Sequence, residues 1–375
     1  MRGGLQLIAF FPEKVEDVAR VAFPRVFAEY RSAGRAEDRS QFWDNVQFLR
    51  FLAAYAIVLI HAQAIFDAMN AAPAFVESLR VGTDLFLVLA GFFTAHAINR
   101  SSEPTLSYIR NRMIRIYPAF ALFTILAFIS KEFEVGQAHQ IGELVSSLMF
   151  VPYGPYPILH PTWTLNFIIE FSLLAAITLM LDVRWRMPVL CTLALTLVFF
   201  GQIGHVETYP WIEYTNPLLI DLVLGVLIFA IVQLDLTSVM ARRPVLIAAC
   251  LFILAGLTAA ILRPFYWIDA PRPLALGIPA AGILFGTLLL EKQGVRLRLT
   301  FINFMAKCSY SIYLCHQFVI GVSIRLIAAH PLSGAALAFL LAATLFVVTV
   351  GSILVYVYVE APLARYLLNA TASRK

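Results

Sequence analysis

The chain alternates long apolar runs with short polar loops. A run of about 20 apolar residues crosses a hydrocarbon core of about 30 Å when it forms an α-helix. Ten runs approach this length when they are read against the residues that break them, near 46–66, 80–98, 116–130, 163–181, 188–203, 216–233, 245–262, 273–290, 308–328 and 335–359. The pattern therefore predicts an all-α polytopic membrane protein of about ten transmembrane helices.

The composition supports this interpretation and excludes a water-soluble globule. Of the 375 residues, 60% are hydrophobic and 14% are charged, whereas soluble domains carry roughly 25% charged residues. The mean hydropathy is +0.80. A net charge of +5 could suggest nucleic acid, but the Lys and Arg residues lie in short loops between apolar runs. We therefore expect a lipid bilayer, and no nucleic acid, as the partner.

The basic residues also predict an orientation. Loops on one side of the predicted membrane hold twelve Lys and Arg residues, and loops on the other side hold four. The positive-inside rule places the richer side in the cytoplasm, together with both termini. We expect residues 1–40 to form a cytoplasmic or interfacial extension, residues 41–362 the transmembrane domain, and residues 363–375 a cytoplasmic tail.

Two ionisable residues share one face of the first predicted span. Eleven positions separate Arg50 from His61, which brings them to within about 20° of one helical stripe and about 16 Å apart along the axis. A guanidinium near the cytoplasmic mouth could hold phosphate, and a deeper imidazole could accept a proton. Composition alone slightly favours the alternative, in which Arg50 snorkels to the headgroups and His61 only packs.

Two further features lie near this stripe. Asp84, close to the outer end of the second span, could orient the His61 imidazole, although a carboxylate in the first turn of a helix is also favoured by the helix dipole. Arg112 and Arg115 are three positions apart on the cytoplasmic side. They could clamp a diphosphate, or they could only set the topology.

Several separated motifs together resemble those of the membrane-bound acyltransferase family 3, whose members include bacterial polysaccharide O-acetylases. The first is Leu-Arg-Phe-Leu-Ala-Ala at 49–54, followed by His61. The others are Gly-Thr-Asp-Leu-Phe-Leu-Val-Leu-Ala-Gly-Phe at 82–92, Arg-Met-Ile-Arg-Ile-Tyr-Pro at 112–118, Ser-Tyr-Ser-Ile-Tyr-Leu-Cys-His at 309–316 and Val-Glu-Ala-Pro at 359–362. They follow the order expected for the family.

The resemblance implies an O-acyltransferase of the bacterial inner membrane. A cytoplasmic acyl-CoA, above all acetyl-CoA, would donate its acyl group to a sugar hydroxyl of a cell-surface or lipid-linked polysaccharide. His61 would be the catalytic base, polarised by Asp84, and the donor phosphates would bind Arg50, Arg112 and Arg115. The motifs add six other candidates, Trp163, Glu170, Tyr310, Tyr313, His316 and Glu360. We expect no metal and no tightly bound cofactor.

The segment after the longest outer loop departs from the family pattern. The loop, about 131–162, carries prolines among aromatics; it could dock a polysaccharide or belong to an aromatic belt. The glutamate expected five residues after Trp163 is Ile168, and Glu170 follows two residues later. Two residues rotate a side chain by about 200°, so Glu170 can substitute only in an irregular helix.

A transporter or flippase for a polysaccharide precursor is the alternative function. Intramembrane Arg, His and Asp also mark substrate paths and proton relays. Broken helices paired across two halves of the chain would favour transport. None is apparent in the sequence.

Overall fold

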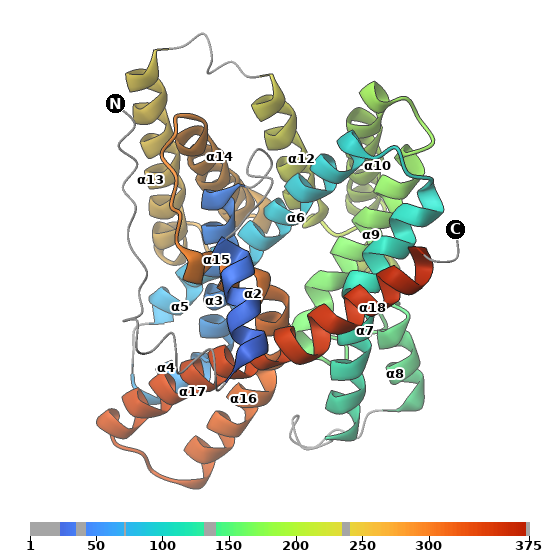
Figure 1. The fold of residues 1–375 in the computed structure, drawn as a ribbon. Coiled ribbons are helices and arrows are strands. Elements are labelled where there is room, and N and C mark those ends of the chain that lie inside the picture. Colours follow the sequence, from blue (N-terminus) through green and yellow to red (C-terminus); the bar gives the residue numbers. More distant parts are fainter. Residues whose placement is uncertain (1–22, 35–42, 71–72, 131–139, 235–240, 373–375) are drawn as a thin grey trace.

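The computed structural model describes residues 23–34, 43–70, 73–130, 140–234 and 241–372, and every element in these ranges is a helix (Figure 1). The N-terminal half contains α2 (Pro24–Gly34), α3 (Asp44–His61), α4 (Gln63–Ala68), α5 (Pro73–Leu79), α6 (Val81–Arg100), α7 (Thr105–Ile129), α8 (Ile141–Leu148), η1 (His160–Thr162) and α9 (Trp163–Thr178). The C-terminal half contains α10 (Val183–Ile203), α11 (Trp211–Tyr214), α12 (Leu219–Gln233), α13 (Arg242–Tyr266), η3 (Pro273–Gly277), α14 (Ile278–Lys292), α15 (Thr300–Lys307), α16 (Ser309–Ala329), α17 (Gly334–Val355), η4 (Tyr356–Glu360) and α18 (Ala361–Ala372).

The expected all-α membrane fold is confirmed. Among the residues that the structure describes, nine helical segments are long and apolar enough to cross a membrane: Ala74–Arg100, Thr105–Ile129, His160–Thr178, Val183–Ile203, Trp211–Gln233, Arg242–Tyr266, Pro273–Lys292, Ser309–Ala329 and Gly334–Thr371. They coincide with nine of the ten predicted spans. The predicted first span is α3, which carries Asp44, Asn45, Gln47 and Arg50 in its first two turns and is therefore less apolar than the others.

Helix α3 nevertheless lies inside the bundle. It packs against α6, α14, α15 and α16, and five of its buried residues belong to two apolar clusters of the core: Val46, Leu49 and Ala53 to one, and Ala54 and Val58 to the other. The helix ends at His61, where Ala62 forms a turn before α4. The sequence pattern had extended this span to residue 66, because α4 is also largely apolar.

A buried carboxylate from another helix caps the start of α3. The backbone N–H groups of Asp44 and Asn45 donate to the two oxygens of Glu291, at 2.7 and 3.1 Å. The Asn45 side chain adds a bond to the Val295 carbonyl at 2.7 Å. These bonds satisfy N–H groups that a helix leaves unpaired at its start. They fix α3, and with it Arg50 and His61, to the end of α14.

Glycines bring α6 into backbone contact with its neighbours. A Cβ added to Gly91 would collide with the backbone of Leu222 in α12, and one added to Gly225 would collide with the backbone of Val88 in α6. A Cβ added to Gly82 would collide with the Cβ of Ala56 in α3. Small residues permit such close crossings between membrane helices. Helix α6 is thus locked between α3 and α12.

Candidate active site

His61 lies at the end of α3 in a defined tautomer. Its Nδ1 is 2.8 Å from the carbonyl oxygen of Ile57, one turn earlier. A carbonyl oxygen only accepts hydrogen bonds, so Nδ1 carries the hydrogen of the neutral ring and Nε2 is left with a lone pair. The ring is half-buried. This arrangement suits a proton acceptor, as the sequence analysis expects of His61.

Two more histidines lie beside His61. The ring of His316, from α16, is 4.9 Å away between centroids and tilted by 59°, and the ring of His160, from η1, is 6.2 Å away. Tyr156 stacks on His160 at 3.7 Å. The sequence motifs include His316 without indicating a role, and they do not include His160, which stands three positions before Trp163. Within the described part of the chain, no three His, Cys, Asp or Glu residues are placed to hold a metal ion.

The two tyrosines of the Ser309–His316 motif hold this part of the bundle together. The Tyr313 hydroxyl is 2.6 Å from the Pro161 carbonyl and 2.9 Å from the hydroxyl of Thr164. Tyr310 donates to the Ile116 carbonyl of α7 at 2.8 Å. Tyr313 thus fixes the η1 turn, which carries His160, against α16, and Tyr310 fixes α16 against α7.

Arg50 points toward α16. Its guanidinium donates to Gln47 at 3.1 Å and to Ser309 at 3.0 Å, and it lies 5.7 Å from the centre of the Phe93 ring. Glu360 interacts electrostatically with Arg50 and accepts a bond from Ser311 at 2.5 Å. The structure therefore brings together side chains from the first and the last of the sequence motifs.

A hollow of about 480 Å³ opens between the end of α6 and the start of α7. Arg100, Arg112 and Arg115 line it. Arg112 also donates to Thr94 at 3.2 Å. The next residue toward the N-terminus, Phe93, has the Arg50 guanidinium over its ring. Guanidinium groups converging on an open hollow are suited to bind phosphate. The sequence analysis had counted Arg100 only among the loop residues that set topology.

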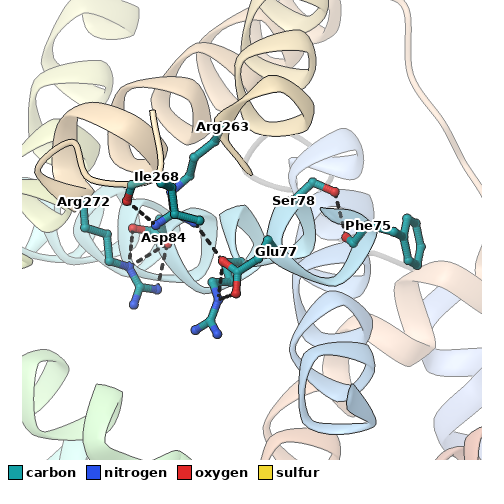
Figure 2. Close-up of polar contacts among 8 residues, drawn as sticks. Phe75, Glu77, Ser78, Asp84, Arg263, Ile268 and Arg272 are labelled. Atoms are coloured by element: carbon teal, nitrogen blue, oxygen red, sulfur yellow. Dashed lines mark hydrogen bonds and ion pairs between the residues drawn. The ribbon is translucent and has the colours of Figure 1, made fainter. Parts of the chain in front are cut away.

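Asp84 is paired with an arginine (Figure 2). The Arg272 guanidinium donates to both oxygens of Asp84, at 3.1 Å from Nε and 2.9 Å from Nη2. Burial lowers the pKa of Arg272, but the carboxylates of Asp84, Asp221 and Glu77 together outweigh this effect and raise that pKa. The expected contact of Asp84 with His61 is thus replaced by an ion pair with Arg272, and the Ile57 carbonyl is the partner of His61 Nδ1.

The same ion-pair region continues through α5 and α13. Glu77 lies between Arg80, at 2.9 Å, and Arg263, at 3.0 Å. Figure 2 shows Glu77 and Arg263 next to the pair of Asp84 and Arg272. Arg80 is also within electrostatic reach of His61. These residues hold α5, α6 and α13 together at the end of the bundle that contains His61.

Glu170 does not take the position of the missing glutamate. Helix α9 is a regular α-helix from Trp163 to Thr178. Glu170 could take the place of the family's glutamate only if this helix were irregular. Glu170 instead interacts electrostatically with Glu213 of α11. The Arg272 guanidinium lies over the Trp163 ring, 5.6 Å from its centre. Trp163 and Glu213 also line a cavity of about 10 Å³, which has room for about one water molecule.

The bundle and these side chains describe a multi-pass membrane protein with a partly exposed histidine and an arginine-lined hollow. The chain matches the family described as acyltransferase domain over residues 43–357, so it belongs to the membrane-bound acyltransferase family 3. It is 29% identical over 298 residues to the exopolysaccharide production protein ExoZ of Rhizobium meliloti (strain 1021), across 76% of this chain and 89% of that protein. No solved structure shows significant similarity to it. The resemblance seen in the motifs is confirmed, and the protein is a membrane acyltransferase.

Proposed function

We propose that the protein transfers an acyl group, above all acetyl, from cytoplasmic acyl-CoA to a sugar hydroxyl of a cell-surface or lipid-linked polysaccharide. The main support is the pairing of two features in one bundle, an imidazole with a free Nε2 lone pair and a hollow lined by three arginines. The relative from Rhizobium meliloti, named for exopolysaccharide production, supports a polysaccharide acceptor. The basic loops favour an inner membrane protein with cytoplasmic termini.

The hollow is the proposed site for the donor's phosphates. Arg100, Arg112 and Arg115 would bind them from the cytoplasmic side. The pantetheine arm would then run past Thr94 and Phe93, where Arg112 and Arg50 meet α6. This path leads from the hollow into the bundle, toward the face of α3 that carries Arg50 and His61.

The proposed chemistry is an acyl transfer coupled to two proton transfers, one to His61 and one from it. A sugar hydroxyl is a poor nucleophile at neutral pH and needs a base in its transition state. Nε2 of His61 takes the hydroxyl proton while the oxygen attacks the thioester carbonyl. The new C–O bond forms, the C–S bond breaks, and the departing thiolate recovers the proton from His61. The acceptor would approach along Tyr156 and His160, which lie on the loop beside His61.

Mass spectrometry of surface polysaccharide tests this function. Cells that produce the protein should carry ester-linked acyl groups on their polysaccharide, and cells that lack it should not. Purified protein in liposomes should transfer labelled acetyl from acetyl-CoA to the deacylated polysaccharide. Identical polysaccharide from both cell types, together with no transfer in liposomes, would rule the proposal out.

The arginines of the hollow give a second prediction. Arg115→Ala should raise KM for acyl-CoA by about tenfold with little change in kcat, because one charge-assisted contact to phosphate is lost. Arg110→Ala is the matched control, since Arg110 lies on the same helix and outside the lining of the hollow. Equal KM values in the two variants would mean that Arg115 only sets the topology.

A further inference from the structure

His316 leaves a buried acceptor atom without a partner. The residue is fully buried, and its Nδ1 lies 3.0 Å from the Ile312 carbonyl. This bond assigns the hydrogen of the neutral ring to Nδ1, so Nε2 carries a lone pair. No residue in the described part of the chain forms a hydrogen bond with this Nε2. Such atoms are uncommon in folded proteins because each costs about 1–3 kcal/mol.

The nearest ring to this lone pair belongs to His61. Both imidazoles turn Nδ1 back to the carbonyl of their own helix, so both turn Nε2 away from it. Helices α3 and α16 pack against each other, and the two ring centroids are 4.9 Å apart. While both rings are neutral, two lone pairs gain nothing from this proximity. When His61 takes a proton, its ring becomes positively charged next to a buried acceptor.

We propose that His316 is a positioning residue whose Nε2 lone pair stabilises the charge that His61 acquires during acyl transfer. The proposal rests on the proposed role of His61 as base. His316 neither gains nor loses a proton in the cycle: the hydroxyl proton moves to His61 and then to the departing thiolate. The energetic advantage arises in the transition state, because the lone pair of the buried His316 ring is already oriented and needs no reorganisation when the charge appears.

The other groups that face His61 do not place a buried acceptor atom this close to its ring. His160 meets His61 at 6.2 Å and is stacked on Tyr156. Arg80 is positive and opposes a second positive charge on His61. Tyr313, whose ring is 6.5 Å from His316, has its hydroxyl bonded to Pro161 and Thr164. Each of these contributes to the pH profile, so the test compares variants at His316 alone.

The test is a pair of variants at His316 that differ in the acceptor atom. His316→Phe keeps a ring and removes the lone pair. It should lower kcat by about 30-fold, the effect of losing one acceptor for a charged donor, with both KM values within about twofold. The acidic limb of the kcat–pH profile should move to lower pH, because protonated His61 is less stable. The amide oxygen of His316→Gln reaches the level of Nε2. This variant should therefore recover most of kcat, and the acidic limb of its kcat–pH profile should return to the wild-type position.

Several outcomes would overturn the proposal. His316→Phe with unchanged kcat and pH profile would do so, and so would His316→Gln as slow as His316→Phe, because the ring and not its lone pair would then matter. Thermal unfolding in detergent monitors folding. If His316→Phe does not fold, His316→Asn replaces it, since its amide reaches only to the level of Nδ1. His330→Gln removes an exposed histidine at the end of the same helix and should change neither quantity.

The role of His61 is tested separately from that of His316. An active His61→Ala enzyme would refute the proposed function itself. An inactive His61→Ala enzyme combined with a normal His316→Phe enzyme would refute only the role of His316.

Discussion

Replacement of His61 by alanine should abolish acyl modification of the polysaccharide while the protein still folds and inserts. Loss of a general base typically costs about 10²–10⁴-fold in rate, and we expect at least about 10³-fold here because the Nδ1 hydrogen bond of His61 leaves its Nε2 as the proposed proton acceptor. Alanine suits the end of α3, so the helix should persist. The acyl content of surface polysaccharide, measured by mass spectrometry against the amount of protein in the membrane, gives the result.

The exposed His330 provides the matched control for this variant. His330→Ala should leave the acyl content unchanged, since the residue is exposed beyond the end of α16. Normal acylation in His61→Ala cells would remove His61 from the chemistry and leave it a packing residue.

Replacement of Asp84 by asparagine should destabilise the protein by about 3 kcal/mol. The Asp84 carboxylate is fully buried and is paired with Arg272, and removal of one partner leaves the other charge uncompensated. Unfolding in detergent, followed by temperature or denaturant, measures the loss. Asp67→Asn changes an exposed aspartate and should stay within about 0.5 kcal/mol of wild type.

The same pair of variants separates two roles of Asp84. If Asp84→Asn is as stable as Asp67→Asn but inactive, Asp84 takes part in the chemistry, as the sequence analysis suggests. If Asp84→Asn is unstable and its folded fraction keeps its kcat, the ion pair with Arg272 is its role. Replacing both Asp84 and Arg272 by leucine should then restore part of the stability, because neither charge of this pair is left without the other.

The sequence predicts the spans well because burial in lipid requires long apolar helices. The boundaries of α3 are predicted less well. Its polar first turns are stabilised by Glu291 of α14, a contact across 247 positions, and its end at His61 is followed by a short apolar helix that continues the hydrophobic pattern. The local hydrophobic pattern reveals neither the distant contact with Glu291 nor the break between α3 and α4.

The sequence likewise predicts only part of the candidate site. The helical period places Arg50 and His61 on one stripe, and the arginines at 112 and 115 do line a common hollow. The partners of these side chains come from distant helices, such as Ser309 for Arg50 and Arg272 for Asp84. Which side chains pair across the bundle depends on the crossing angles of the helices. The depth of a residue along its own span does not determine these angles. His160 was missed because it lies in the short η1 helix just before the predicted span, where no hydrophobic period marks it.

The glycine contacts of α6 have a consequence for redesign of acceptor specificity. Gly82, Gly91 and Gly225 admit no side chain without displacing a neighbouring helix, so the α3–α6–α12 unit offers few positions for variation. Engineering should begin with the loop that contributes Tyr156 and His160, whose backbone is bonded to Ser147 of α8 and to Tyr313 of α16. Libraries that keep the three glycines and randomise this loop would sample new sugar acceptors without weakening the scaffold that carries His61.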